Sequence, residues 1–146
     1  MKIALGCDHA GFTLKESIKN YFDSKQYFYT DFGVFKTAAV DYPDFAFTVA
    51  RAVADRQYDR GVLICATGIG MCITANKVKG IRAALAYSLK TAELSRLHND
   101  SNILCLGGRE LVIQDALDMV EIWLKTSFEG GRHQKRSDLI TKLTGL

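Results

Sequence analysis

The sequence predicts an α/β protein: a three-layer α/β/α sandwich around a five-stranded parallel sheet. Short apolar runs alternate along the chain with stretches whose apolar residues recur at helical spacing, which is typical of a parallel sheet with helices on both faces. The run Gly61–Ala66 is apolar throughout, as expected for a central strand buried on both sides. Because 146 residues fit one domain, we expect a single domain over residues 1–146.

The first half of the chain contains two predicted strands and two predicted helices. Lys2–Cys7 is an apolar strand that ends in the polar turn Asp8–Gly11. A helix from Thr13 follows, because apolar residues at positions 14, 18, 21 and 22 share one helical face. Tyr27–Phe32 is the second strand. The segment Asp41-Tyr42-Pro43 opens the next helix, since proline is tolerated in a first turn.

The second half repeats the alternation three times. After the strand Gly61–Ala66 and the turn Thr67–Gly70, we expect a helix over Met71–Val78. The fourth strand is Ile81–Ala86, followed by a helix near residues 89–97. The fifth is Ile103–Leu106, followed by a long amphipathic helix over residues 113–124 and a last helix that includes residues 139–143.

Composition narrows the classes of partner and location. The net charge of +3 is too small to indicate nucleic-acid binding. No apolar stretch reaches the roughly 20 residues that span a membrane, and Asp8 and His9 interrupt the N-terminal apolar run too early for a signal peptide. We therefore expect a cytoplasmic protein without membrane or nucleic-acid partners. Its four cysteines form no CxxC pair and are expected to be reduced.

Polar residues follow three of the predicted strands. Asp8-His9 ends the first, Cys65–Gly70 the third, and Gly107-Gly108-Arg109 the fifth. Ligands of open parallel sheets bind beyond the carboxyl ends of the strands. We therefore expect these segments to meet at one rim of the sheet.

Cys65 is the sharpest catalytic candidate. It stands at a strand end just before a helix, where a thiolate is favoured and could act as a general base. The alternative is an ordinary core cysteine, as we expect for Cys7 and Cys105, with Cys72 serving only in packing. The loop Thr67–Gly70 could hold an anion through its backbone N–H groups, or could be only a tight turn. No ligand spacing supports a zinc site.

Two further groups suit acid–base work and phosphate binding. His98 has the residue type for general acid–base catalysis, or is a surface capping histidine. Arg132 and Arg136 are four residues apart, so both face one way on a starting helix. Paired guanidiniums suit a phosphate dianion, although a solvated basic face is the alternative.

With these residues in place, the chain resembles the type B ribose-5-phosphate isomerases, a group that includes allose- and galactose-6-phosphate isomerases. The segments that carry the resemblance run in family order from the N-terminus to about residue 140: Gly6-Cys7-Asp8-His9-Ala10-Gly11, Asp41-Tyr42-Pro43, Ile64-Cys65-Ala66-Thr67-Gly68-Ile69-Gly70, Ala75-Asn76-Lys77, His98-Asn99-Asp100, Gly107-Gly108-Arg109 and Glu129-Gly130-Gly131-Arg132-His133-Gln134. The resemblance implies strand order 2-1-3-5-4, a homodimer whose active sites are shared between chains, and no metal or nucleotide cofactor. It leaves open whether dimers pair into tetramers.

The resemblance also implies an aldose–ketose isomerisation of ribose 5-phosphate and ribulose 5-phosphate, as in pentose phosphate metabolism. Cys65 would remove the C2 proton, because Met71 replaces the carboxylate that some members use. His98 would assist ring opening, from the neighbouring subunit. Thr67 and the following N–H groups of Gly68, Ile69 and Gly70 would stabilise the enediolate oxygen, and Asp8 would bind sugar hydroxyls and shuttle protons.

Other residues are expected to bind the substrate by resemblance alone. His9, Arg132 and Arg136 would hold the phosphate, with Arg109 supplied by the partner chain, and Tyr42 and Asn99 would line the pocket. The sequence departs from the family pattern at Ala66, usually Gly, and at Cys72, commonly Ser.

The alternatives are a hexose 6-phosphate substrate and a sugar-phosphate sensor without catalysis. A flavodoxin-like carrier is disfavoured because no hydroxyl-rich loop follows the first strand.

Overall fold

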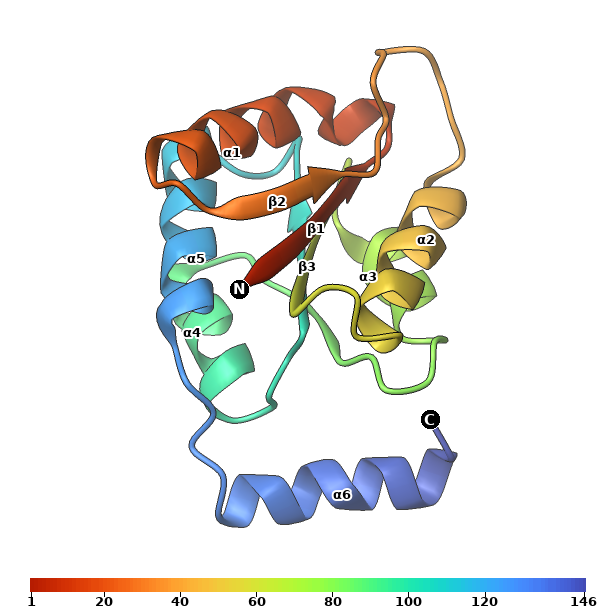
Figure 1. Cartoon of the computed structure of the whole chain (residues 1–146), viewed down its shortest axis with the longest axis vertical. Helices are drawn as coiled ribbons and strands as arrows, with labels where there is room; N and C mark the ends of the chain where they lie inside the picture. Colours follow the sequence, from red (N-terminus) through yellow and green to blue (C-terminus); the bar gives the residue numbers. More distant parts are fainter.

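The computed structural model describes residues 1–146 and has the predicted architecture, a parallel sheet between helical layers (Figure 1). The five strands are all parallel, in the order β2-β1-β3-β5-β4. Their bounds are β1 (Lys2–Cys7), β2 (Phe28–Asp31), β3 (Arg60–Cys65), β4 (Ala83–Leu85) and β5 (Ile103–Gly107). The predicted fold class and strand order are confirmed.

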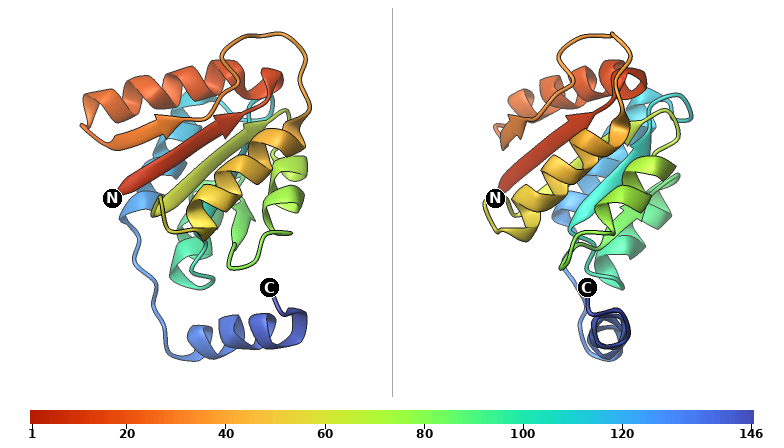
Figure 2. Two further views of the ribbon diagram at one scale, coloured as in Figure 1. Left: turned by 45° about the vertical axis from the view of Figure 1, so that its right-hand side comes forward. Right: turned by 90° about the vertical axis from the view of Figure 1, so that its right-hand side faces the viewer.

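Two helical layers cover the sheet. The helices are α1 (Phe12–Ser24), α2 (Tyr42–Ala54), α3 (Ile69–Ala75), α4 (Leu89–Leu97), α5 (Ile113–Lys125) and α6 (Arg132–Thr144), with a short 3-10 helix η1 (His9–Gly11) before α1. Helices α1, α4 and α5 lie on one side of the sheet, and α2 and α3 on the other (Figures 1 and 2).

Alternating side chains of β3 explain its continuous apolar run. Val62 and Ile64 enter the core beneath α1 and α5, while Leu63 and Cys65 enter the core beneath α2 and α3. Both faces are buried, so the strand needs apolar residues at every position. Burial of this kind stabilises the fold by roughly 1.5–3 kcal/mol for each large aliphatic side chain.

The bounds of α3 and β4 differ from the prediction. Helix α3 begins at Ile69 because the Gly68 carbonyl already accepts the Cys72 N–H (3.0 Å). It ends at Ala75, and the next side chain, Asn76, leaves the helix to exchange two hydrogen bonds with the backbone of Ala83 (both 2.9 Å). These two hydrogen bonds hold the first residue of β4, Ala83, so the strand begins two residues later than predicted.

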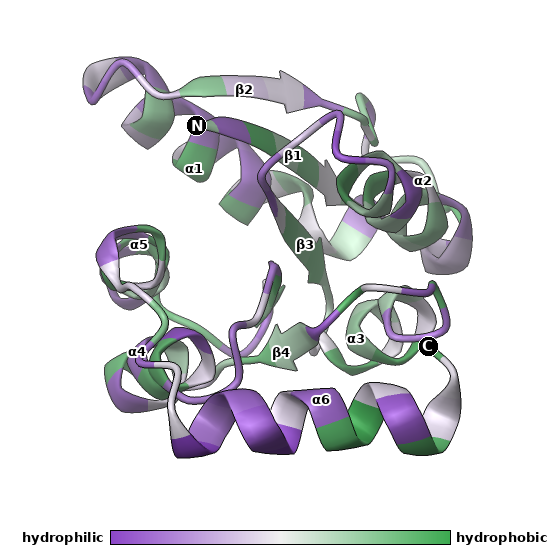
Figure 3. Cartoon of the chain, turned by 60° about the horizontal axis from the view of Figure 1, so that its bottom comes forward, coloured by the Kyte–Doolittle hydropathy of each residue, from purple (hydrophilic) through white to green (hydrophobic).

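Helix α6 lies apart from the sandwich, below the body in Figure 1 and beneath β4 in Figure 3. Three of its apolar side chains are more than half exposed: Leu139, Ile140 and Leu143. None of the helices combines the length and the apolarity needed to cross a membrane.

Candidate active site

Three strand ends meet at the carboxyl edge of the sheet. The Asp8 N–H donates to the Ile64 carbonyl (3.1 Å), which joins the end of β1 to β3. The N–H groups of Gly108 and Arg109 donate to the carbonyls of Cys65 (2.8 Å) and Ala66 (3.0 Å), which join the end of β5 to β3. The structure therefore brings the three predicted segments together on one rim.

Cys65 is the last residue of β3 and is 5% exposed. Its Sγ accepts a hydrogen bond from the Gly68 N–H at 3.1 Å. Gly68 has φ +79°, and a Cβ there would lie 2.6 Å from the Leu85 side chain. Only glycine fits this turn, so the N–H group that donates to Cys65 Sγ depends on a glycine at position 68.

Asp8 and His9 lie at the same edge of the sheet as Cys65, with Asp8 capping η1 and His9 beginning it. Asp8 is buried, and its Oδ1 accepts the N–H groups of Ala10 (2.9 Å) and Gly11 (3.0 Å). The second carboxylate oxygen stays available for a ligand hydroxyl. His9 Nδ1 accepts the Val40 N–H (3.3 Å), so Nε2 carries the hydrogen and can donate to an anion.

The loop between β3 and α3 faces Tyr42. Thr67 Oγ1 accepts the Ile69 N–H at 3.3 Å, which shapes the turn. A Cβ at Gly70 would lie 2.6 Å from the Tyr42 ring, so ring and loop are in close contact. The Tyr42 ring thereby covers one side of the loop.

The other three cysteines have side chains in the two cores: Cys7 beneath α1 and α5, Cys72 and Cys105 beneath α2 and α3. Burial raises the pKa of Cys7 to about 11 and the pKa of Cys105 well above its ordinary value. Cys72 behaves differently: hydrogen bonding from the Cys105 thiol, helped by Asn76, lowers the pKa of Cys72 to about 7. Cys72 is partly exposed, and its Sγ contacts the Ala83 carbonyl (3.4 Å) at the start of β4. No sequence pattern indicated this lowering of the Cys72 pKa.

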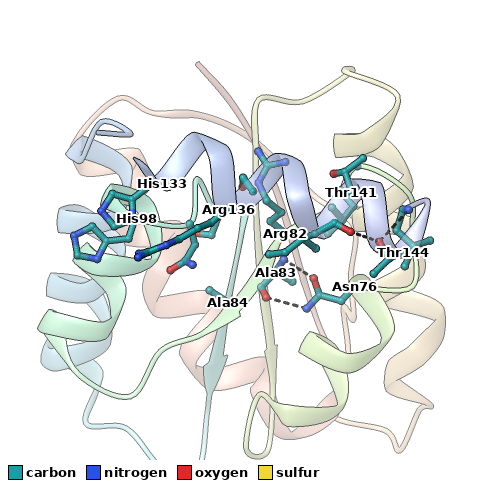
Figure 4. Close-up of a pocket in the computed structure, with 16 residues that line it drawn as sticks. Asn76, Arg82, Ala83, Ala84, His98, His133, Arg136, Thr141 and Thr144 are labelled. Carbon is teal, nitrogen blue, oxygen red and sulfur yellow. Dashed lines mark hydrogen bonds between the residues drawn. The ribbon is translucent and has the colours of Figure 1, made fainter. Parts of the chain in front are cut away.

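His98, Asn99, Arg132 and Arg136 lie elsewhere. They gather at the amino edge of the sheet, where α4 ends and α6 begins. His98, Asn99 and Arg136 line a cavity of 580 Å³ between α6 and the β4 edge (Figure 4). Arg82 and Ala83 form part of its opposite wall.

Two imidazoles and a carboxylate meet at this edge. The rings of His98 and His133 are stacked, with centroids 4.1 Å apart and planes 5° from parallel. Glu129 Oε2 lies 3.7 Å from His98 Nε2 and 3.9 Å from His133 Nε2. From the sequence, no role was assigned to Glu129 or His133, although both lie in the segment Glu129–Gln134 that carries part of the family resemblance.

These three side chains could in principle hold a metal, since their ligand atoms lie within 4.8 Å of one another. However, Arg132 Nε donates to His133 Nε2 at 3.3 Å and occupies that lone pair. The parallel rings also direct their lone pairs side by side and not toward one point. The arrangement is therefore not preorganised for a metal ion.

The predicted site is thus divided within one chain. We call Asp8, His9, Cys65, Thr67 and Arg109 the thiol half-site, and His98, Asn99, Arg132 and Arg136 the imidazole half-site. The five residues of β5 separate the two edges, about 16 Å at roughly 3.3 Å per residue. The Arg109 N–H donates to the Ala66 carbonyl, so Arg109 lies at the same edge of the sheet as Cys65 of its own chain.

Comparison with known proteins identifies the family of this chain. A family model described as Ribose/Galactose Isomerase matches residues 3–140. Ribose-5-phosphate isomerase B of Escherichia coli is 44% identical, over 97% of this chain and 95% of that protein.

Solved structures match along the whole fold. Ribose-5-phosphate isomerase B of Clostridium thermocellum superposes with a TM-score of 0.98 at 47% identity, covering 99% of this chain and 98% of that one. The Mycoplasma genitalium enzyme with bound ribulose-5-phosphate has a TM-score of 0.94 at 45% identity, covering 99% of this chain and 96% of that one. The chain belongs to the Ribose/Galactose Isomerase family, and its similarity to type B ribose-5-phosphate isomerases extends over nearly the full length.

Proposed function

We propose that this protein interconverts ribose 5-phosphate and ribulose 5-phosphate. The observation that carries the proposal is the thiol half-site: a nearly buried sulfur that accepts a backbone N–H, beside a buried carboxylate with one free oxygen. The Escherichia coli relative is named for this activity, and the Mycoplasma genitalium relative holds ribulose-5-phosphate.

The proposed chemistry moves one proton between neighbouring carbons. The Cys65 thiolate takes the C2 proton of the open-chain aldose, and the C2–H electron pair forms the enediolate double bond while negative charge moves to O1. Thr67 and the backbone N–H groups that follow it stabilise this charge. The thiol then returns the proton to C1, and Asp8 moves the hydroxyl proton from O2 to O1, which leaves the ketone at C2.

Ring opening comes first, because the aldose is a furanose in water. The C1–O4 bond breaks, O4 gains a proton from the imidazolium of His98, and the anomeric hydroxyl loses its proton to Asp8 as the carbonyl forms. His98 of the same chain cannot reach Cys65 across the height of the sheet. We therefore propose a homodimer in which the partner's His98 completes each site.

Phosphate binding would likewise draw on both chains. His9 and Arg109 come from the thiol half-site, and the partner's Arg132 and Arg136 supply two guanidinium forks. Tyr42 and the partner's Asn99 would line the sugar. The proposed mechanism needs only side chains and backbone of the protein.

Replacement of Cys65 by alanine tests the base. We expect kcat for ribulose 5-phosphate formation, measured with chelator present, to fall about 10²–10⁴-fold, the range of general acid–base catalysis. Exchange of the C2 hydrogen with D₂O should fall equally, while circular dichroism stays unchanged. Cys72→Ser is the matched control and should keep normal turnover. Near-normal activity of Cys65→Ala would exclude Cys65 as the base.

A hexose 6-phosphate substrate is the second candidate, since the family description also names galactose isomerase. Comparison of kcat/KM for ribose 5-phosphate and allose 6-phosphate distinguishes the two. A sensor without catalysis would bind either sugar phosphate and exchange no hydrogen with D₂O.

A further inference from the structure

We propose that Glu129 and His133 are positioning residues that hold the imidazole of His98 for opening the sugar ring. This inference rests on the role proposed above for His98. It adds two residues that the sequence did not single out, and it assigns each a separate task.

Glu129 is anchored beside the end of α4. Its backbone N–H donates to the Leu97 carbonyl at 3.0 Å, immediately before His98. Its Oε2 then lies 3.7 Å from His98 Nε2. This distance suits an ion pair with a protonated imidazole and exceeds a hydrogen bond, as is common for catalytic contacts before substrate binds.

The Glu129 carboxylate lies near two imidazoles, and of these it pairs with His98. Arg132 Nε donates to His133 Nε2, so that nitrogen is an acceptor and His133 is neutral. Burial of His133, together with the nearby charges of His98, Arg132 and Arg136, lowers the pKa of His133 and outweighs the opposing effect of Glu129. Glu129 is therefore placed to stabilise a proton on His98 and not one on His133.

His133 supplies a rigid wall. It is 4% exposed, and its ring stacks on His98 at 4.1 Å. The stack prevents the His98 ring from turning, and Glu129 engages Nε2. Nδ1 is then the nitrogen left to donate its proton to the furanose oxygen, in the manner of an imidazole oriented by a carboxylate.

A comparison of two reactions tests this assignment. Forward conversion of ribose 5-phosphate requires ring opening. Exchange of the C1 hydrogens of ribulose 5-phosphate with D₂O does not, because O5 is esterified and this ketose cannot close a furanose. For Glu129→Gln we expect about a 10-fold loss of the forward rate, the scale of one hydrogen bond to a charged group, with exchange at the wild-type rate.

Controls separate this inference from the proposed function. Glu93→Gln changes a half-buried glutamate on α4 that pairs with Lys90, and it should alter neither reaction. His133→Phe keeps a stacking ring and should retain more forward rate than His133→Ala. If His98→Gln slows only the forward reaction but Glu129→Gln slows both or neither, the positioning role is wrong and the role of His98 stands. If His98→Gln slows both or neither, the ring-opening role itself is wrong.

Discussion

The four cysteines have very different surroundings in this protein. Cys7 and Cys105 lie within strands, where burial disfavours the thiolate and raises the pKa of each. Cys72, one helix away, has a pKa lowered to about 7 by the Cys105 thiol and Asn76. Cys65 ends β3, and its Sγ faces the Gly68 N–H in the turn that leads into α3. Position in the fold, and not residue type, therefore separates the proposed base from the other thiols.

The pKa of Cys72 predicts its reactivity. A lowered pKa means that the thiolate forms at lower pH than for an ordinary cysteine near 8.5. We expect alkylation of Cys72 by iodoacetamide to reach half its maximal rate near pH 7, while Cys7 and Cys105 stay unmodified in the folded protein. Peptide mass spectrometry across a pH series measures this, and Cys72→Ser removes the signal. A half-point near the ordinary cysteine value would contradict the hydrogen-bonding account.

Among the elements, the turn between β3 and α3 has the strictest requirements. Gly68 adopts φ +79° there, and a Cβ would also lie 2.9 Å from the Leu106 backbone. Backbone conformation and lack of space both exclude a side chain. The same glycine donates to Cys65, so the local structure and the proposed chemistry depend on one residue.

A matched pair of variants separates these two constraints. Gly80 has a similar φ of +82° but nothing within 4 Å of a built Cβ. Gly80→Ala should cost about 1–2 kcal/mol for the left-handed backbone alone. Gly68→Ala should cost roughly 1–3 kcal/mol more, because of overpacking against Leu85 and Leu106. Urea unfolding measures both, and equal losses would show that space at Gly68 does not matter.

The whole molecule presents two half-sites at opposite edges of one sheet. β5 separates them within a chain, and α6 carries part of the imidazole half-site away from the sandwich. The exposed apolar residues of α6, Leu139, Ile140 and Leu143, are the kind of surface that a second copy covers. A two-fold dimer could then unite the thiol half-site of each chain with the imidazole half-site of the other.

Complementation tests this division. Cys65→Ala and His98→Gln should each be inactive as homodimers. Co-expressed, they should regain about one quarter of wild-type activity, since half of randomly paired dimers are mixed and each mixed dimer has one of its two sites intact. Co-expression of Cys65→Ala with Asp8→Asn, both in the thiol half-site, should regain none. Equal activity from the two pairings would exclude a shared site.

The sequence predicted the layers of the fold well, because strand and helix periods are local. The bounds of α3 and β4 were missed because they depend on contacts beyond the local pattern, namely the turn at Gly68 and the hydrogen bonds between Asn76 and Ala83. The thiol half-site was foreseeable, since parallel strands place their carboxyl ends together.

The alternation of buried strands with amphipathic helices, and the residue types that end each strand, can be read from the sequence. Tertiary packing sets three other features: His98 lies a sheet's height from Cys65, Glu129 meets two stacked imidazoles, and Lys15 is fully buried, with its Nζ 2.7 Å from Asp31 Oδ2. The two kinds of feature differ in the distance along the chain over which they act. Periodicity depends on neighbours along the chain, whereas these contacts join segments whose approach is set by how the packed layers close on one another.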